Sequence, residues 1–121
     1  MNPENPKLVL ASASPRRLNL LKSINIEPFL IKAPNIDETV KKNENPVSLV
    51  QRLAKQKAFK VREKLEIKAF ILAADTVAVC RKKILPKAIT KEQLQYCLKL
   101  ISGRRHTIYT GIAIIDLKNC L

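Results

Sequence analysis

Short apolar runs alternate with amphipathic segments along this chain, and the alternation predicts a fold of strands and helices. A run of consecutive apolar residues is typical of a strand buried inside a sheet. Apolar residues that recur every three or four positions instead indicate one buried helix face. The candidate strands are residues 8–10, 28–32, 69–74, 77–80 and 106–115. Because helices separate these runs, we expect an α/β fold with a mixed sheet flanked by helices.

Capping signals mark the ends of the predicted helices. Ser14 and Asn45 are N-cap residues, and each precedes a proline, which fits the first position of a helix. Thr90 begins a capping box for a third helix, and Gly103 is placed as the stop of that helix. The basic stretch at residues 81–83 is typical of a hairpin or an exposed turn.

The second helix shows the longest apolar stripe. Lys57 lies close to this stripe, and such a lysine usually extends its ammonium outward to solvent. The residues of the stripe are Val47, Val50, Leu53, Ala54, Ala58, Val61 and Leu65.

Length and composition fit a single soluble domain over residues 1–121. Hydrophobic residues make up 46% and charged residues 27% of the chain, which is typical of a globular protein. The beginning of the chain does not resemble a signal peptide, and no apolar run is long enough to span a bilayer. Cys80, Cys97 and Cys120 are widely spaced, which favours reduced thiols in a cytoplasmic protein and no structural zinc site.

The formal net charge of +13 has three interpretations. A nucleic-acid-binding protein is one, because phosphate neutralisation is a common use of excess positive charge. However, the basic residues are scattered and lack the interleaved aromatics of a stacking surface, so nucleic acid is not the favoured partner. A small polyphosphate ligand would use the same charge, and drift in composition toward lysine remains the third interpretation.

Asp75 is the first candidate for chemistry, because it directly follows an apolar run that is typical of a central strand. Open α/β sheets bind ligands at this end of their strands, and a carboxylate buried there needs a cation as its partner. A turn or helix cap is the alternative for Asp75. Asp37 and Glu38 form a second acidic group, which either shares Mg²⁺ or Mn²⁺ with Asp75 or belongs to a solvated loop.

Two arginines at a helix start form a candidate anion site. Arg16 and Arg17 follow the Ser14-Pro15 cap, where the helix dipole favours anions over cations. Free backbone N–H groups and two guanidinium groups would together bind a phosphate or carboxylate. Two solvated surface charges are the alternative. The sequence has no phosphate-binding glycine loop, and His106 has no nucleophile partner at a recognisable spacing.

Six motifs follow one another in order: SASPRRLNLL, NIDET, RLAKQKA, AADTV, ILPK and LISGRRHTIYTG. Together they resemble the Maf (septum formation protein) family of nucleoside triphosphate pyrophosphatases, from residue 7 to residue 115. The resemblance implies an α/β fold with a ligand cleft, and hydrolysis of a nucleoside triphosphate to a monophosphate and pyrophosphate. It also implies a divalent cation, clearance of non-standard nucleotides and a link to cell-division arrest. A homodimer is a further option.

The resemblance assigns roles to individual positions. Asp75 matches the catalytic proton acceptor, and Arg17 and Thr76 match specificity positions, in a form similar to the branch that acts on dTTP and UTP. The expected substrate-binding residues are Ser12, Ser14, Arg16, Arg17, Lys57, Thr76 and Lys87. The expected metal ligands are Asp37, Glu38 and Asp75.

The chain departs from the family pattern in two places. Pro86 stands where the family often has glycine, and its fixed φ would redirect Lys87. Family members also continue beyond the matched motifs with further strands, a helix and a base-selecting glutamine. We therefore expect the N-terminal portion of the family fold, incomplete at the C-terminus. An inactive homologue that only binds nucleotides, and a basic nucleic-acid-binding module, are the alternative functions.

Overall fold

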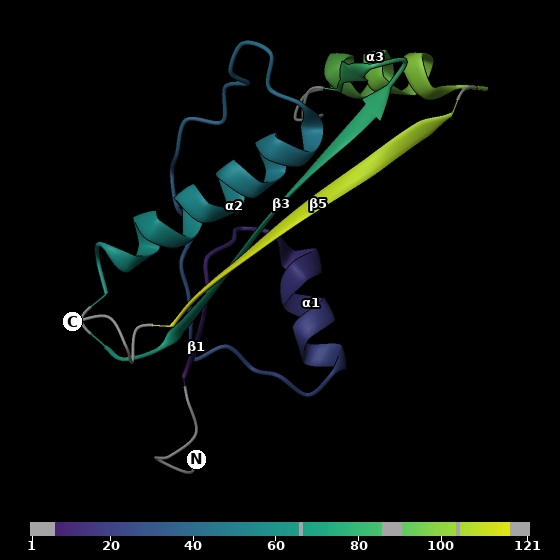
Figure 1. Cartoon of the computed structure of the whole chain (residues 1–121). Coiled ribbons are helices and arrows are strands. Elements are labelled where there is room, and N and C mark those ends of the chain that lie inside the picture. Colours follow the sequence, from purple (N-terminus) through teal and green to yellow (C-terminus); the bar gives the residue numbers. More distant parts are fainter. Residues whose placement is uncertain (1–6, 66, 86–90, 104, 117–121) are drawn as a thin grey trace.

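A computed structural model describes residues 7–65, 67–85, 91–103 and 105–116 of the chain (Figure 1). Its strands and helices alternate, as the sequence predicts. In chain order the elements are β1 (Leu8–Leu10), α1 (Pro15–Ser23), β2 (Leu30–Ile31), α2 (Pro46–Arg62), β3 (Phe70–Cys80), β4 (Lys83–Ile84), α3 (Lys91–Ile101) and β5 (His106–Asp116).

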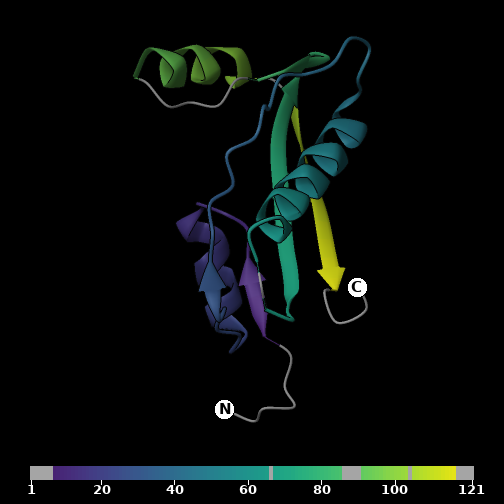
Figure 2. The same ribbon diagram turned by 90° about the vertical axis from the view of Figure 1, so that its left-hand side faces the viewer.

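Strand β3 is the centre of a mixed sheet, which confirms the predicted fold class. β5 pairs with β3 in antiparallel register along its full length, from Phe70 opposite Asp116 to Cys80 opposite His106. Figure 2 shows β2, β1, β3 and β5 side by side, and β2 and β1 pair in parallel. The two runs predicted at residues 69–74 and 77–80 form one continuous strand, because β5 supplies hydrogen-bond partners across the residues between them.

The second edge of β3 is paired only at its two ends. β1 pairs in parallel with Phe70–Leu72, and β4 pairs antiparallel with Val79 and Cys80. Among the described residues, no strand pairs with residues 73–78 on this edge. The sheet therefore has an opening between the end of β1 and the start of β4. Asp75 and Thr76 lie at this opening.

Helices α1 and α2 cover opposite faces of the sheet (Figure 1). One face of β3 presents Ile71 and Ala73 to the apolar stripe of α2, and these residues are fully buried. Ser14 and Asn45 cap α1 and α2 as predicted, with hydrogen bonds from the backbone N–H groups three residues later. Val47 departs from the predicted stripe. It is 47% exposed because it lies in the first turn of α2, before the buried residues begin at Leu49.

Local backbone geometry confirms two further sequence predictions. Arg81 and Lys82 have φ angles of 53° and 65°, as the short turn between β3 and β4 requires. Gly103 follows α3 with a φ of 67°, the left-handed conformation that commonly ends a helix. The predicted cap Thr90 and the residues Pro86 and Lys87 lie outside the described residues.

The face of the sheet away from α2 is less covered. Ile108, Ile112 and Ile114 of β5 project on this face and are each more than 60% exposed, as is Leu20 of α1. Apolar surface of this kind is where further polypeptide usually packs. None of the described helices is long and apolar enough to cross a membrane.

The two faces of the sheet should respond differently to the loss of an isoleucine side chain. Ile71→Ala removes a fully buried side chain, so we expect the free energy of unfolding to fall by about 2–5 kcal/mol. Ile112→Ala, on the exposed face, should change it by about 0.5 kcal/mol or less. Urea unfolding followed by circular dichroism measures both values. Equal losses would contradict this assignment of the core.

Candidate active site

Asp75 is a buried carboxylate with one paired oxygen. Its side chain is 2% exposed and lies on the face of β3 that packs against α2. The Lys57 ammonium of α2 donates a hydrogen bond of 2.7 Å to Asp75 Oδ1. A carboxylate is rarely buried without such a partner, because removing its charge from water costs several kcal/mol. The candidate that the strand pattern identified is therefore held by a cation from another element.

Lys57 connects two carboxylates. Its Nζ atom also lies 3.2 Å from Glu38 Oε1, and the lysine side chain is only 12% exposed. Instead of extending to solvent, this lysine points toward the sheet and pairs with Asp75 and Glu38. With formal charges, the cluster of two carboxylates and one ammonium carries a net charge of −1.

The second oxygen of Asp75 has no partner among the described residues. Oδ2 is buried and accepts no hydrogen bond there. An unsatisfied buried oxygen of this kind costs about 1–3 kcal/mol or more, so its presence usually has a specific reason. A bound cation, a water molecule or a substrate hydrogen would each satisfy it. Oδ2 is thus the atom of the cluster whose capacity to accept a hydrogen bond or bind a cation is unused among the described residues.

Arg17 reaches the opening in the sheet from the other face. Its Nη2 atom donates to Thr76 Oγ1 at 3.2 Å, and its Nη1 atom donates to Ser12 Oγ at 3.4 Å. Ser12 Oγ also accepts the backbone N–H of Ser14, and Thr76 shares a hydrogen bond with Thr110 of β5. Thr76 follows Asp75 directly. The guanidinium group is therefore anchored one residue from the buried carboxylate.

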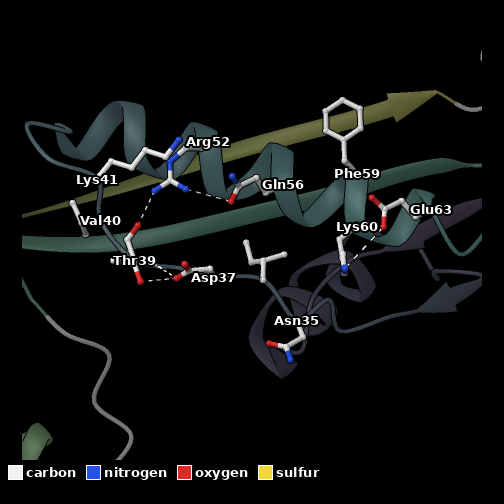
Figure 3. Close-up of a pocket in the computed structure, with 11 residues that line it drawn as sticks. Asn35, Asp37, Thr39, Val40, Lys41, Arg52, Gln56, Phe59, Lys60 and Glu63 are labelled. Atoms are coloured by element: carbon white, nitrogen blue, oxygen red, sulfur yellow. Dashed lines mark hydrogen bonds and ion pairs between the residues drawn. The ribbon is translucent and has the colours of Figure 1, made fainter.

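Not all of the predicted site residues converge. Arg16 is exposed in the first turn of α1, and Lys87 lies outside the described residues. Asp37 accepts hydrogen bonds from the backbone and side chain of Thr39, which lower its pKa. It lines a separate open pocket of about 700 Å³ beside α2 (Figure 3). Of the expected metal ligands, only Glu38 and Asp75 meet at Lys57, and no group of three ligating side chains occurs among the described residues.

Arg52 fastens the acidic loop to α2, a role that the sequence did not reveal. Its Nε and Nη2 atoms bind both carboxylate oxygens of Glu44 at 2.7 and 2.8 Å. Nη2 also donates to the carbonyl oxygen of Thr39 at 2.9 Å, next to Glu38 (Figure 3 shows Arg52 and Thr39). Arg52 stands in the RLAKQKA motif, but its partners are separated from it by 8 and 13 residues, so no local spacing indicated them.

The fold and the site together define an α/β protein with a buried Asp–Lys–Glu cluster at an opening in its sheet. The family model described as "Maf-like protein" matches residues 7–120, so the chain belongs to this family. It is 49% identical over 116 residues to a Rickettsia akari protein named "Nucleoside triphosphate pyrophosphatase" and 48% identical over 118 residues to a Rickettsia felis protein of the same name. These matches cover 96% and 98% of this chain and 58% of each relative. The chain thus spans little more than half the length of these curated relatives.

The Glu44–Arg52 pair should make stability depend on pH in acid. Hydrogen bonds from Arg52 and from the Lys41 backbone lower the pKa of Glu44 from 4.5 to about 2. The stabilisation is therefore complete above pH 4.5 and is lost as the pH falls toward 2. We expect Glu44→Gln to lower the melting temperature at pH 7 and to have little effect near pH 2.

Thermal unfolding from pH 2 to pH 7 measures this difference. The matched control is Glu63→Gln. Glu63 is 67% exposed, and its contact with Lys60 is long, at 3.9 Å, so its ion pair is weak. The melting temperature of the Glu63→Gln variant should equal that of the wild type at every pH. A Glu44→Gln effect of constant size between pH 2 and pH 7 would be inconsistent with the lowered pKa.

Proposed function

We propose that this chain carries the catalytic residues of a nucleoside triphosphate pyrophosphatase. In this reaction water attacks the α-phosphorus of the substrate, the bond to the β-phosphate breaks, and monophosphate and pyrophosphate are released. The observation that supports it best is the state of Asp75, with Oδ1 held by Lys57 and Oδ2 buried without a partner among the described residues. Membership of the Maf-like family and the names of the two Rickettsia relatives point in the same direction.

Asp75 is proposed as the proton acceptor. A general base must present an oriented oxygen within hydrogen-bond reach of the attacking water. The bond from Lys57 fixes the carboxylate through Oδ1, which leaves Oδ2 for the proton of that water. Burial also keeps bulk water away from the reacting group and strengthens nearby electrostatic interactions.

Cationic side chains are proposed to bind the triphosphate. Arg17 binds Thr76, the next residue after Asp75, on the opposite face of β3, and Arg16 occupies the same helical turn as Arg17. Neutralising the phosphate oxygens where charge develops is the usual largest contribution to catalysis of phosphoryl transfer. Ser12, Ser14 and Thr76 would order the binding loop around Arg17, and Lys57 and Lys87 complete the expected set.

A divalent cation fits the carboxylates that the structure brings together. The carboxylates of Asp75 and Glu38 are hard oxygen donors, which suit Mg²⁺ or Mn²⁺. A cation bound beside the Asp75–Lys57–Glu38 cluster would also offset its net charge of −1, which opposes the approach of a triphosphate. When bound, the cation supplies charge neutralisation at the phosphate oxygens. We propose Asp75 and Glu38 as its protein ligands.

The finer features of the proposal come from the family resemblance. The arginines at positions 16 and 17 and the threonine at position 76 favour dTTP, UTP or modified nucleotides as substrates. We further propose that residues 1–121 act as one domain in the cytoplasm, in nucleotide-pool clearance with a link to cell-division arrest, and a homodimer is compatible with this role. A second function, nucleotide binding without turnover, would need only the anion site around Arg17, whose contacts do not involve Asp75.

Loss of the proposed base should abolish turnover. We expect Asp75→Asn to lower the rate of pyrophosphate release from dTTP or UTP with Mg²⁺ by about 100- to 10,000-fold, because the amide cannot take the proton of water. Glu63→Gln is the matched control, since it neutralises an exposed carboxylate outside the site. Release that is unchanged in Asp75→Asn would refute the mechanism. Nucleotide binding by calorimetry without any release by the wild type would instead support the second function.

The cation ligands can be tested separately from turnover. We expect Mn²⁺ binding, measured by calorimetry, to weaken in Glu38→Gln and in Asp75→Asn, because each variant removes a hard anionic oxygen. Asp37→Asn is the matched neighbour and should bind Mn²⁺ like the wild type, since Asp37 pairs with Thr39 instead. If Asp37→Asn binds Mn²⁺ more weakly than the wild type, Asp37 is a metal ligand and the proposed pair of ligands is incomplete.

A further inference from the structure

Gly111 of β5 lies at a point where α2 touches the sheet through its backbone. A Cβ atom added at Gly111 would lie 2.5 Å from the carbonyl oxygen of Val50, 2.6 Å from its carbonyl carbon and 2.8 Å from the N atom of Gln51. All three distances are below 3.0 Å, a separation that real Cβ atoms essentially never show. Because these three atoms belong to the helix backbone, no side-chain rotation can relieve the overlap.

Gly111 is also the cross-strand neighbour of Asp75. The antiparallel register places the two residues directly opposite each other, so both face α2. Lys57 lies seven residues after Val50, or two turns along the same helix, and helical side chains lean toward the N-terminus. The lysine that pairs with Asp75 therefore extends back toward the helix segment that rests on Gly111.

We infer that Gly111 is a positioning residue, whose missing side chain sets the distance between α2 and the sheet that the Lys57–Asp75 pair requires. Strand β5 is paired with β3 on both sides of Gly111 along eleven residues, so a larger side chain at this position would displace the helix more readily than the strand. A Cβ atom at position 111 would lie 2.5 Å from the Val50 oxygen, so α2 must move about 0.5 Å away from the sheet to reach a separation of 3.0 Å.

Such a shift acts on the cluster through Lys57. Its 2.7 Å bond to Asp75 and its 3.2 Å contact with Glu38 both depend on where α2 lies above the sheet. Hydrogen bonds weaken steeply with misalignment, and small misplacements at reacting groups cost large factors in rate. This inference rests on the proposed function only for its effect on turnover, because the pairing of Lys57 is a property of the fold.

The test compares the reactivity of lysines in Gly111→Ala and in the wild type. Brief acetylation followed by mass spectrometry reports Lys57, with exposed Lys55 of the same helix as the internal reference. In the wild type we expect Lys57 to react about tenfold more slowly than Lys55, because it is buried and paired. In Gly111→Ala the two rates should come within about threefold of each other.

Val61→Ala is the control for a general loss of stability. It removes part of a buried side chain of α2 without adding an atom between helix and sheet, so Lys57 should keep its wild-type protection. Exposure of Lys57 in both variants, or in neither, would overturn the inference. A Gly111→Ala chain that shows no folded circular-dichroism spectrum would also overturn it, since the residue would then be needed for folding itself.

A kinetic measurement separates positioning from binding. We expect Gly111→Ala to lower kcat by about 100-fold and to raise KM by about tenfold or less, because Lys57 is only one of the proposed triphosphate-binding cations and the arginines of α1 lie on the other face of the sheet. Asp75→Glu, introduced into Gly111→Ala, extends the carboxylate and should restore the protection of Lys57. If the wild type releases no pyrophosphate, the proposed function fails, and the acetylation result still decides the role of Gly111.

Discussion

The ion pair between Lys57 and Asp75 is the interaction on which the candidate site depends. It joins a helix to the central strand at a distance of 2.7 Å, in a position where Asp75 is almost completely buried. A buried pair gains little net stability, but loss of either partner leaves an uncompensated charge inside the protein. The packing of α2 on the sheet and the chemistry of the carboxylate are therefore coupled. The helix cannot move without changing the site.

Both halves of the site lie on the stretch of β3 that has no described strand partner on one edge, between β1 and β4. Strand β3 is fully paired along one edge by β5, whereas its other edge is free of strands between the two short partners. Residues on opposite faces of β3 can approach a common ligand only at such a gap. Asp75 faces Lys57 on one side of the strand, and Thr76 faces Arg17 on the other. The topology thus brings a carboxylate and a cationic anion site to one place.

The site is held together by contacts that involve main-chain atoms as well as side chains. α2 rests on β5 at Gly111 through its backbone, and Arg52 ties the loop that carries Glu38 to the same helix. Each contact restricts one component of the cluster. The helix fixes Lys57, the strand fixes Asp75, and Arg52 fastens the loop at Thr39 and Glu44, after the residue that completes the cluster. Pre-organisation of this kind is what a charged transition state requires.

The sequence by itself determined the local structure and most candidate residues. Its cap residues located the starts of α1 and α2, its apolar runs located β1, β2, β3 and β5 but not β4, and the position of Asp75 after such a run identified the carboxylate. Local patterns suffice here because capping and strand formation depend on neighbours along the chain. Only the tertiary structure decided that Lys57 turns inward to join Asp75 with Glu38, that Asp37 lies apart, and that Arg52 and Gly111 support the site. These features depend on the spacing and register of segments far apart in the chain, which no local pattern encodes.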